Sequence, residues 1–74
     1  MSDIDFVPVD RNLSRSLCGN YTMMQSNGFN NYVIYKLYRN GAEIATEKCR
    51  NSREDRLDAV STLVDVASED ASNR

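Results

Sequence analysis

Histidine and tryptophan are both missing from this sequence, and the lack of histidine excludes several kinds of active site. Without an imidazole there is no Ser–His or Cys–His nucleophile pair, and no side chain whose ordinary pKa lies near neutrality. The three glycines are isolated and form no phosphate-cradling loop. Carboxylate pairs such as Glu54 and Asp55 lie in no recognisable loop motif. We therefore predict that the protein is not an enzyme and uses no cofactor or metal ion.

Long apolar runs and a strong excess of one charge are also missing. No run approaches the ~20 residues that a membrane helix requires, and the start, MSDIDFVPVD, is acidic where a signal peptide is basic and then apolar. The 11 acidic and 9 basic residues give a net charge of −2, with the basic residues scattered along the chain. We therefore expect a cytoplasmic protein, in the host cytoplasm if a phage encodes it. Neither a membrane nor nucleic acid is an expected partner.

Cysteine is scarce. Cys18 and Cys49 are too few for a disulfide scaffold and lack the C-x-x-C spacing of redox or zinc sites. Two reduced, partly buried thiols are favoured over one disulfide, and both alternatives stay open. The 74 residues suffice for a single domain, 1–74, which buries only about 60% of its unfolded surface. Because so small a core leaves no room for a deep pocket, we expect a site on the surface.

Two Asn-Gly dipeptides, at 27–28 and 40–41, each lie between β-prone runs. Asn-Gly favours a two-residue type I′ hairpin turn, since both turn residues need a positive φ. This pattern predicts a three-stranded antiparallel meander. Its expected strands are 20–26, 30–39 and 42–49.

The second turn predicts which residues share a face of this meander. A two-residue turn at 40–41 places Leu37 opposite Ile44, and Tyr35 opposite Thr46, on one face. The other face then has a row of tyrosines and aliphatic residues. Its expected members are Tyr21, Met23, Tyr32, Ile34, Lys36 and Tyr38, with Glu43, Ala45, Glu47 and Cys49 across from them.

The C-terminal third of the sequence has the pattern of an amphipathic helix. Ser52 and Asp55 form a capping-box-like S-x-x-D start. Apolar residues recur at helical spacing after it, namely Leu57, Val60, Leu63, Val64 and Ala67. We predict a helix over 53–68, packed on the sheet face that carries Val33, Tyr35 and Leu37, and a frayed tail at 69–74.

The first twenty residues give weaker signals. Apolar residues alternate with aspartates near Pro8, which lacks the N–H that a central strand needs, so we predict an arm or an edge strand over 1–10. Asp10 as a helix start and Gly19 as a helix stop predict one or two helical turns between them. The predicted fold is therefore α+β: a three-stranded antiparallel meander with one C-terminal helix packed on one face, and an N-terminal arm or short helical turn.

One helix covers only one face of such a sheet, so the tyrosine-bearing face needs other cover. Two interpretations are open. The N-terminal segment folds back over this face with Ile4, Phe6, Val7, Leu13 and Leu17, or part of the face binds a partner, because tyrosine offers large and rigid contact area. The outer side of the helix is a second candidate surface or simply a solvated face, with carboxylates at Glu54, Asp58, Asp65 and Glu69.

From Phe29 to Ala67, the order of strand, Asn-Gly turn, strand, short polar link and capped helix is similar to the second half of a double-stranded-RNA-binding domain. That family has lysines at the start of this helix to bind phosphates, whereas residues 52–56 here contain two acids and two arginines, which argues against RNA binding. In size, charge and sheet-plus-helix pattern the chain also resembles the small host-takeover proteins of bacteriophages. Those are single domains that inhibit a host machine, such as RNA polymerase or a CRISPR complex, by occupying a surface.

These observations predict a non-enzymatic regulator or inhibitor that binds a host protein or protein complex. The resemblance implies a transcription regulator that binds bacterial RNA polymerase. The alternatives are an anti-CRISPR or nucleic-acid-mimic inhibitor, or a degenerate nucleic-acid-binding module. We expect a monomer or weak dimer, with aromatic anchors for affinity and carboxylates for steering. The predicted partner-binding residues are Asp3, Asp5, Phe6, Asp10, Tyr32, Ile34 and Tyr38.

Overall fold

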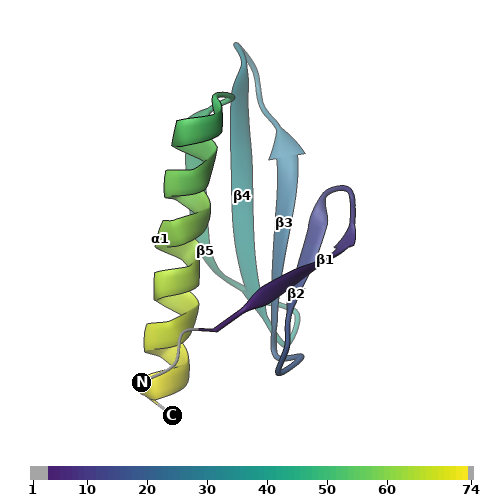
Figure 1. The fold of residues 1–74 in the computed structure, drawn as a ribbon, viewed down its shortest axis with the longest axis vertical. Helices are drawn as coiled ribbons and strands as arrows, with labels where there is room; N and C mark the ends of the chain where they lie inside the picture. The colour runs from purple at the N-terminus through teal and green to yellow at the C-terminus, as the bar shows by residue number, and fades with distance from the viewer. Residues whose placement is uncertain (1–3, 74) are drawn as a thin grey trace.

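The computed structural model describes residues 4–73, which form a five-stranded antiparallel sheet followed by one helix (Figure 1). The strands lie side by side in chain order. They are β1 (Phe6–Asp10), β2 (Leu13–Ser16), β3 (Tyr21–Asn27), β4 (Tyr32–Arg39) and β5 (Ala42–Arg50), and helix α1 spans Arg53–Ser72. The α+β class is as predicted, but the predicted three-stranded sheet is wrong, because β1 and β2 add two strands to it.

The two additional strands replace the predicted helical turns between Asp10 and Gly19. Strand β2 pairs with β1 on one side and β3 on the other, and these backbone hydrogen bonds outweigh a weak local helix signal. Gly19, at φ 81°, serves the turn between β2 and β3 rather than a helix end. The edge-strand alternative for the start of the chain is confirmed over β1, where Pro8 is tolerated because this strand has only one neighbour.

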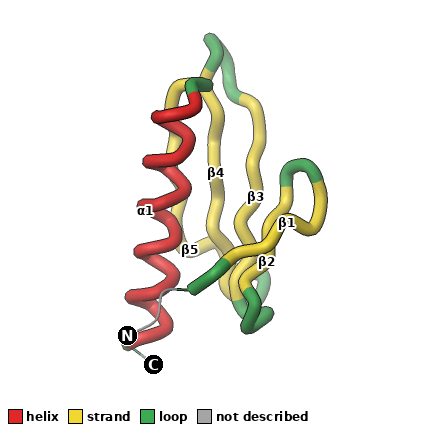
Figure 2. The backbone as a smooth tube through the Cα atoms, in the orientation of Figure 1, coloured by secondary structure: helices red, strands yellow, loops and turns green. Residues whose placement is uncertain are grey.

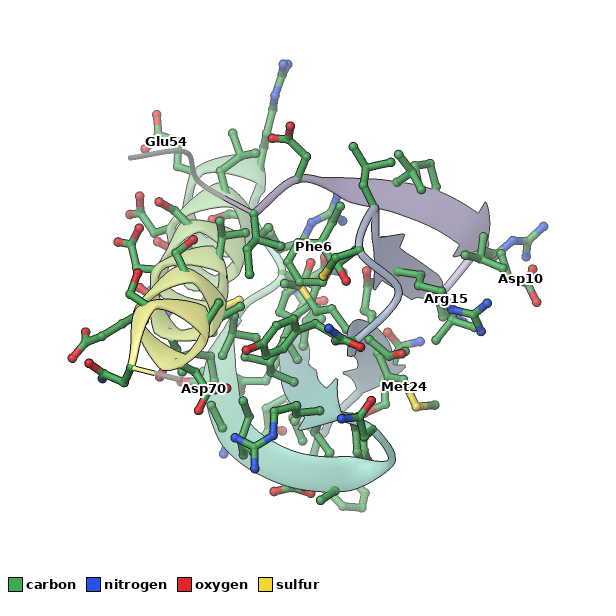
Figure 3. The ribbon with its side chains drawn as sticks, turned by 90° about the horizontal axis from the view of Figure 1, so that it is seen from below. Phe6, Asp10, Arg15, Met24, Glu54 and Asp70 are labelled. Atoms are coloured by element: carbon green, nitrogen blue, oxygen red, sulfur yellow. The ribbon has the colours of Figure 1, made fainter. Side chains whose placement is uncertain are left out.

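The sheet is curved, and α1 lies on its concave side. Figure 2 shows the helix running alongside β4 and β5, and Figure 3 shows the strands curving round the side chains of the interior. The segment that leads into β1 returns to the helix, where the backbone N–H of Ile4 donates to Ser68 Oγ at 3.1 Å. The helix therefore closes the space between the two ends of the sheet.

The hydrophobic core lies between the concave sheet face and α1. Leu63 is fully buried on the helix, and its neighbours one turn away, Ala59 and Ala67, are small enough to let the helix approach the sheet closely. The buried residues are Tyr21, Met23, Val33, Tyr35, Leu37, Ala59, Leu63 and Ala67. Leu57 was predicted in the buried stripe but is 59% exposed, because β1 leads away from the first turns of the helix (Figure 1).

The connection between β3 and β4 is a four-residue loop rather than the predicted two-residue turn. Asn27 pairs with Val33 across the loop 28–31. Asn30 and Asn31 in this loop have φ values of 58° and 67°. Changing the pairing by an odd number of positions moves every side chain of a strand to the opposite face. Tyr21 and Met23, which were predicted on the face away from the helix, therefore point into the core and are buried.

The predicted Asn-Gly turn between β4 and β5 is confirmed, since residues 40 and 41 have φ values of 50° and 88°. A register shift between Leu37 and Tyr38 follows this turn. Because the shift inserts one extra residue in β5, Leu37 pairs with Ala45 instead of Ile44. The predicted pairing of Tyr35 with Thr46 is wrong for the same reason, since Tyr35 pairs with Glu47.

The predicted start of the helix is confirmed and its predicted end is wrong. Ser52 is the N-cap, and its Oγ accepts the backbone N–H of Asp55 at 3.2 Å. The helix continues past residue 68 to Ser72. Its last turn is bound to the sheet, because the carboxylate of Asp70 accepts the Tyr21 hydroxyl at 2.6 Å and an Arg39 N–H at 2.8 Å.

Candidate binding surface on the sheet

The side of the sheet that faces away from α1 is the first candidate site. We define the outer sheet face as the outward-pointing residues of β2 to β5, which follow from strand alternation and the pairing register. They are Leu13, Arg15, Thr22, Met24, Ser26, Tyr32, Ile34, Lys36, Tyr38, Glu43, Thr46, Lys48 and Arg50. Figure 3 shows Arg15 and Met24 on this side, away from the helix and the interior.

Cross-strand pairing arranges this face in four rows, each of which contains one cation. One row contains Arg15, Thr22, Tyr38 and Glu43. The next contains Leu13, Met24, Lys36 and Thr46. Beyond these lie Ser26, Ile34 and Lys48, and then the pair of Tyr32 and Arg50. Tyr32 and Ile34 therefore have a cation directly across from them, Arg50 and Lys48 respectively, whereas Tyr38 lies between Thr22 and Glu43.

Two of the cations already have partners within the face. Lys48 Nζ lies 4.8 Å from the centre of the Tyr32 ring, in cation–π geometry. Lys36 Nζ lies 3.9 Å from Glu43 Oε1, and the other oxygen of that carboxylate accepts the Thr46 hydroxyl at 2.7 Å. Because both members of the Lys36–Glu43 pair are more than 40% exposed, this contact stabilises the fold little.

The outer sheet face is positively charged although the protein as a whole is not. It has four cations and one carboxylate, Glu43, in a chain of net charge −2. Four of the nine basic residues, which are scattered in the sequence, are gathered here, because alternate residues of neighbouring strands share a face. Helix α1 has the opposite charge, with six carboxylates and two arginines. Its exposed carboxylates include the predicted acidic surface of Glu54, Asp58, Asp65 and Glu69.

The predicted partner-binding residues divide between the two sides of the sheet. Tyr32, Ile34 and Tyr38 lie together on the outer sheet face and are half-buried. Asp10 is exposed opposite Leu13, at the β1 margin of the same side, and one of its carboxylate oxygens accepts the backbone N–H of Arg11 at 2.7 Å.

The other predicted residues do not join this group. Phe6 packs against the core on the concave side (Figure 3). Asp5 is exposed just before β1, and Asp3 lies outside the described residues. Sequence reasoning missed Arg15, Lys48 and Arg50. The alternation of Thr46, Lys48 and Arg50 along one strand was the signal for two of them, but the register shift in β5 concealed it.

The interpretation in which the N-terminal segment folds back over the tyrosines is wrong. Ile4 and Phe6 pack against the concave core. Strands β1 and β2 extend the sheet instead of crossing its outer face (Figure 1), and Leu17 is 69% exposed. The outer sheet face is therefore accessible across β2 to β5.

Other kinds of site receive no support from residues 4–73. Within them no group of three or more Asp, Glu, Cys or His residues is arranged to hold a metal ion. Cys18 and Cys49 are free thiols. None of the helical structure in the described part of the chain is both long and apolar enough to cross a membrane.

Comparison with known proteins adds nothing to this geometry. No protein-family model matches the sequence, no curated protein matches it, and no solved structure matches the fold. The fold and the outer sheet face therefore define an α+β protein with an accessible, cationic and tyrosine-bearing sheet.

Proposed function

We propose that this protein is a non-enzymatic binding protein whose outer sheet face docks onto an acidic patch of another protein. The observation that supports the proposal is the interleaving of Tyr32, Ile34 and Tyr38 with four cations on an accessible surface. Half-buried tyrosines supply contact area at low entropic cost, and cations in the same rows select a partner of opposite charge.

The spacing of the tyrosines favours a protein partner over nucleic acid. Tyr32 and Tyr38 are six positions apart on one strand, which separates them by about 20 Å at ~3.3 Å per residue. Neighbouring bases of a single strand cannot stack on both rings at that separation. One face of the Tyr32 ring is also occupied by Lys48, and Glu43 lies beside Tyr38 where a phosphate would be repelled.

Within this proposal the protein acts as a regulator of a host macromolecular machine in the cytoplasm. Bacterial RNA polymerase is the first choice, as the resemblance to phage takeover proteins implies, and a CRISPR complex is the second. The gathering of cations on the outer sheet face changes one part of the sequence-based hypothesis. The steering charges at this surface are Arg15, Lys36, Lys48 and Arg50 rather than carboxylates.

Affinity capture with purified targets tests the proposal. The immobilised full-length protein is presented with purified bacterial RNA polymerase, with a purified CRISPR effector complex and with bacterial lysate. A Tyr38→Ala/Arg50→Glu variant should capture at least about tenfold less of the same protein, a loss of ~1.4 kcal/mol or more. A Glu69→Gln variant on α1 is the matched control and should capture as much as the wild type. Capture of no protein, or equal capture by the outer-face variant, contradicts the proposal.

A second candidate function is binding of single-stranded nucleic acid, which the basic and tyrosine-bearing sheet face favours. A gel-shift titration with an oligothymidylate at low salt separates the two. Nucleic-acid binding predicts a shift whose affinity falls with a log–log salt slope of about −2 to −3 for three or four phosphate contacts. If the oligonucleotide does not shift at low salt, this candidate is excluded. If it shifts and Arg50→Glu abolishes the shift, nucleic acid rather than a protein is the partner of the outer sheet face.

A further inference from the structure

A second surface, on the opposite side of the sheet, has the chemistry of a ligand site. Two hollows open to solvent lie on this side, one between α1 and β4 and the other reaching the β1–β2 hairpin, and Tyr35 and Val60 line both. The first hollow also includes Leu57 on the helix. The second reaches the hairpin and includes Phe6 and Met23. We call the pair of hollows the hairpin–helix cleft.

The cleft exists because the segment before β1 approaches α1 near its C-terminal end. The chain entering β1 contacts α1 at Ser68, near the C-terminal end, and the strand then leads away from the first turns of the helix (Figures 1 and 2). Leu57 lies three residues before Val60 and seven before Val64, so it continues the apolar stripe of the helix. No strand covers this part of the stripe, and the Leu57 side chain remains largely exposed.

The charged residues that line the two hollows are all arginines. Arg53 and Arg56 come from the first turn of α1, and Arg11 comes from the turn between β1 and β2, across the cleft. Among the described residues lining the hollows there is no Asp or Glu. Arg56 Nη1 donates to Oδ1 of Asn51 at 3.2 Å, which leaves its other N–H groups able to bind a ligand. Guanidinium groups on both rims of an apolar floor are arranged to accept carboxylates.

We propose that the hairpin–helix cleft binds an acidic and apolar peptide segment of a partner protein. Apolar side chains of the segment occupy the hollows on either side of Tyr35, and its carboxylates pair with Arg11 on one rim and with Arg53 and Arg56 on the other. This site is distinct from the outer sheet face and does not depend on the function proposed for that face.

The shape of the cleft favours a peptide over a small molecule. A small-molecule site encloses most of its ligand, whereas these are two adjacent hollows open to solvent, which suits one side chain in each. The contacts are made by side chains rather than by addition of a strand to β1. Pro8 in the middle of β1 has no N–H, so a guest strand could not form a continuous ladder there.

An NMR titration of the isotopically labelled full-length protein tests the inference. The probe is a blocked synthetic peptide of about nine residues, ~30 Å when extended, in which leucine and aspartate alternate. We expect the backbone amide signals of Tyr35, Leu57 and Val60 to shift at peptide concentrations up to about 1 mM, while those of Tyr38 and Lys48 on the outer sheet face stay unchanged. In one control peptide leucine alternates with lysine, and in a second one serine alternates with aspartate. Both should bind at least about tenfold more weakly.

Matched variants separate binding from folding. An Arg53→Glu/Arg56→Glu variant should weaken the leucine–aspartate peptide at least about tenfold, and acidic residues in the first turn of a helix favour its folding. Arg15→Glu on the outer sheet face is the control and should leave the affinity unchanged. Absence of shifts at the cleft, equal binding of the leucine–lysine peptide, or an unchanged affinity of the double variant would each overturn the proposal.

Discussion

The surroundings of the two cysteines shift the pKa values of their thiols in opposite directions, so the reactivity of the two thiols should differ. Cys18 is exposed, and its Sγ lies 3.3 Å from Ser16 Oγ. That hydrogen bond, helped by the backbone N–H of Asn20, lowers the pKa of the Cys18 thiol, whereas burial raises the pKa of Cys49, with a smaller contribution from Asp55. We expect iodoacetamide to alkylate Cys18 faster than Cys49 at neutral pH, measured by mass spectrometry of the digested protein.

A Ser16→Ala variant is the control for this prediction, since it removes the hydroxyl that stabilises the Cys18 thiolate. The rate at Cys18 should fall in this variant while the rate at Cys49 stays the same. The comparison should be made well below the melting temperature, because Ser16 Oγ also accepts the backbone N–H of Tyr21 at 3.0 Å. Equal rates at the two thiols in the wild type would contradict the assigned surroundings.

Tyr35 should make the fold sensitive to alkaline pH. Burial raises the pKa of this phenol above its ordinary value of 10.0, an effect that the charge of nearby Arg56 reduces in part. The folded state therefore holds the proton more tightly than the unfolded state. This contribution to stability is fully present below pH 10 and declines as the pH rises through the raised pKa.

The measurement is the free energy of urea unfolding at several pH values on both sides of pH 10. A Tyr35→Phe variant has no proton to lose, so its stability should fall less steeply than that of the wild type in this range. Tyr38→Phe on the outer sheet face is the matched control and should behave like the wild type. If the stability of Tyr35→Phe falls as steeply as that of the wild type above pH 10, other groups cause the alkaline sensitivity.

At the scale of elements, the last turn of α1 is held to the sheet by one carboxylate. Asp70 accepts the Tyr21 hydroxyl and forms a salt bridge of 2.8 Å with Arg39, and both charged side chains are less than a third exposed. Asp70→Asn should lower the free energy of unfolding by about 1.5–3 kcal/mol, because it removes charge-assisted hydrogen bonds. Thermal denaturation should show a melting temperature lower by roughly 4–8 °C per kcal/mol. Glu69→Gln, at the exposed neighbouring residue, should have almost no effect. If the two variants lower the free energy of unfolding equally, the bonds to Asp70 contribute nothing.

Two leucines of the same helix provide a direct test of how α1 packs. Leu63 is fully buried and Leu57 is 59% exposed. Leu63→Ala should cost about 2–5 kcal/mol in chemical denaturation, since it leaves a cavity in the core. Leu57→Ala should cost less than about 1 kcal/mol. If the two substitutions cost the same, the helix packs on the sheet with a different face.

At the scale of the whole molecule, all five strands should be needed for cooperative folding. Strands β1 and β2, with Ile4 before them, cover one side of the core that contains Tyr21 and Met23. A fragment beginning at residue 20 retains the three strands first predicted and the helix but loses that cover. We expect it to lack the cooperative thermal transition of the full chain in circular dichroism. A sharp transition in the fragment would show that three strands and a helix suffice.

The two proposed surfaces lie on opposite sides of one thin sheet. The outer sheet face is cationic around tyrosines, and the hairpin–helix cleft has arginine rims around an apolar floor. Because the surfaces share no side chains except Leu13, both can be occupied at once.

Local signals predicted the elements well where the chain interacts with its sequence neighbours. The Ser52 cap and the turn at 40–41 are determined by hydrogen bonds and φ values within a few residues, and both are confirmed. The β1–β2 hairpin was not predicted, because its strands are short and are stabilised by pairing with β3. The exposure of Leu57 also depended on where a distant strand, β1, leaves the helix.

The candidate surface could be predicted only in part for the same reason. The sequence alone determined that Tyr32, Ile34 and Tyr38 share one face, because alternation along a single strand requires it. Tertiary pairing decided which residues lie beside them. The four-residue loop before β4 moved Tyr21 to the core, and the register shift in β5 brought Lys48 and Arg50 outward. Side-chain direction in a sheet has a period of two, so one residue more or less in a loop or strand reverses a face, and only the packing of the whole sheet on the helix selects between these registers.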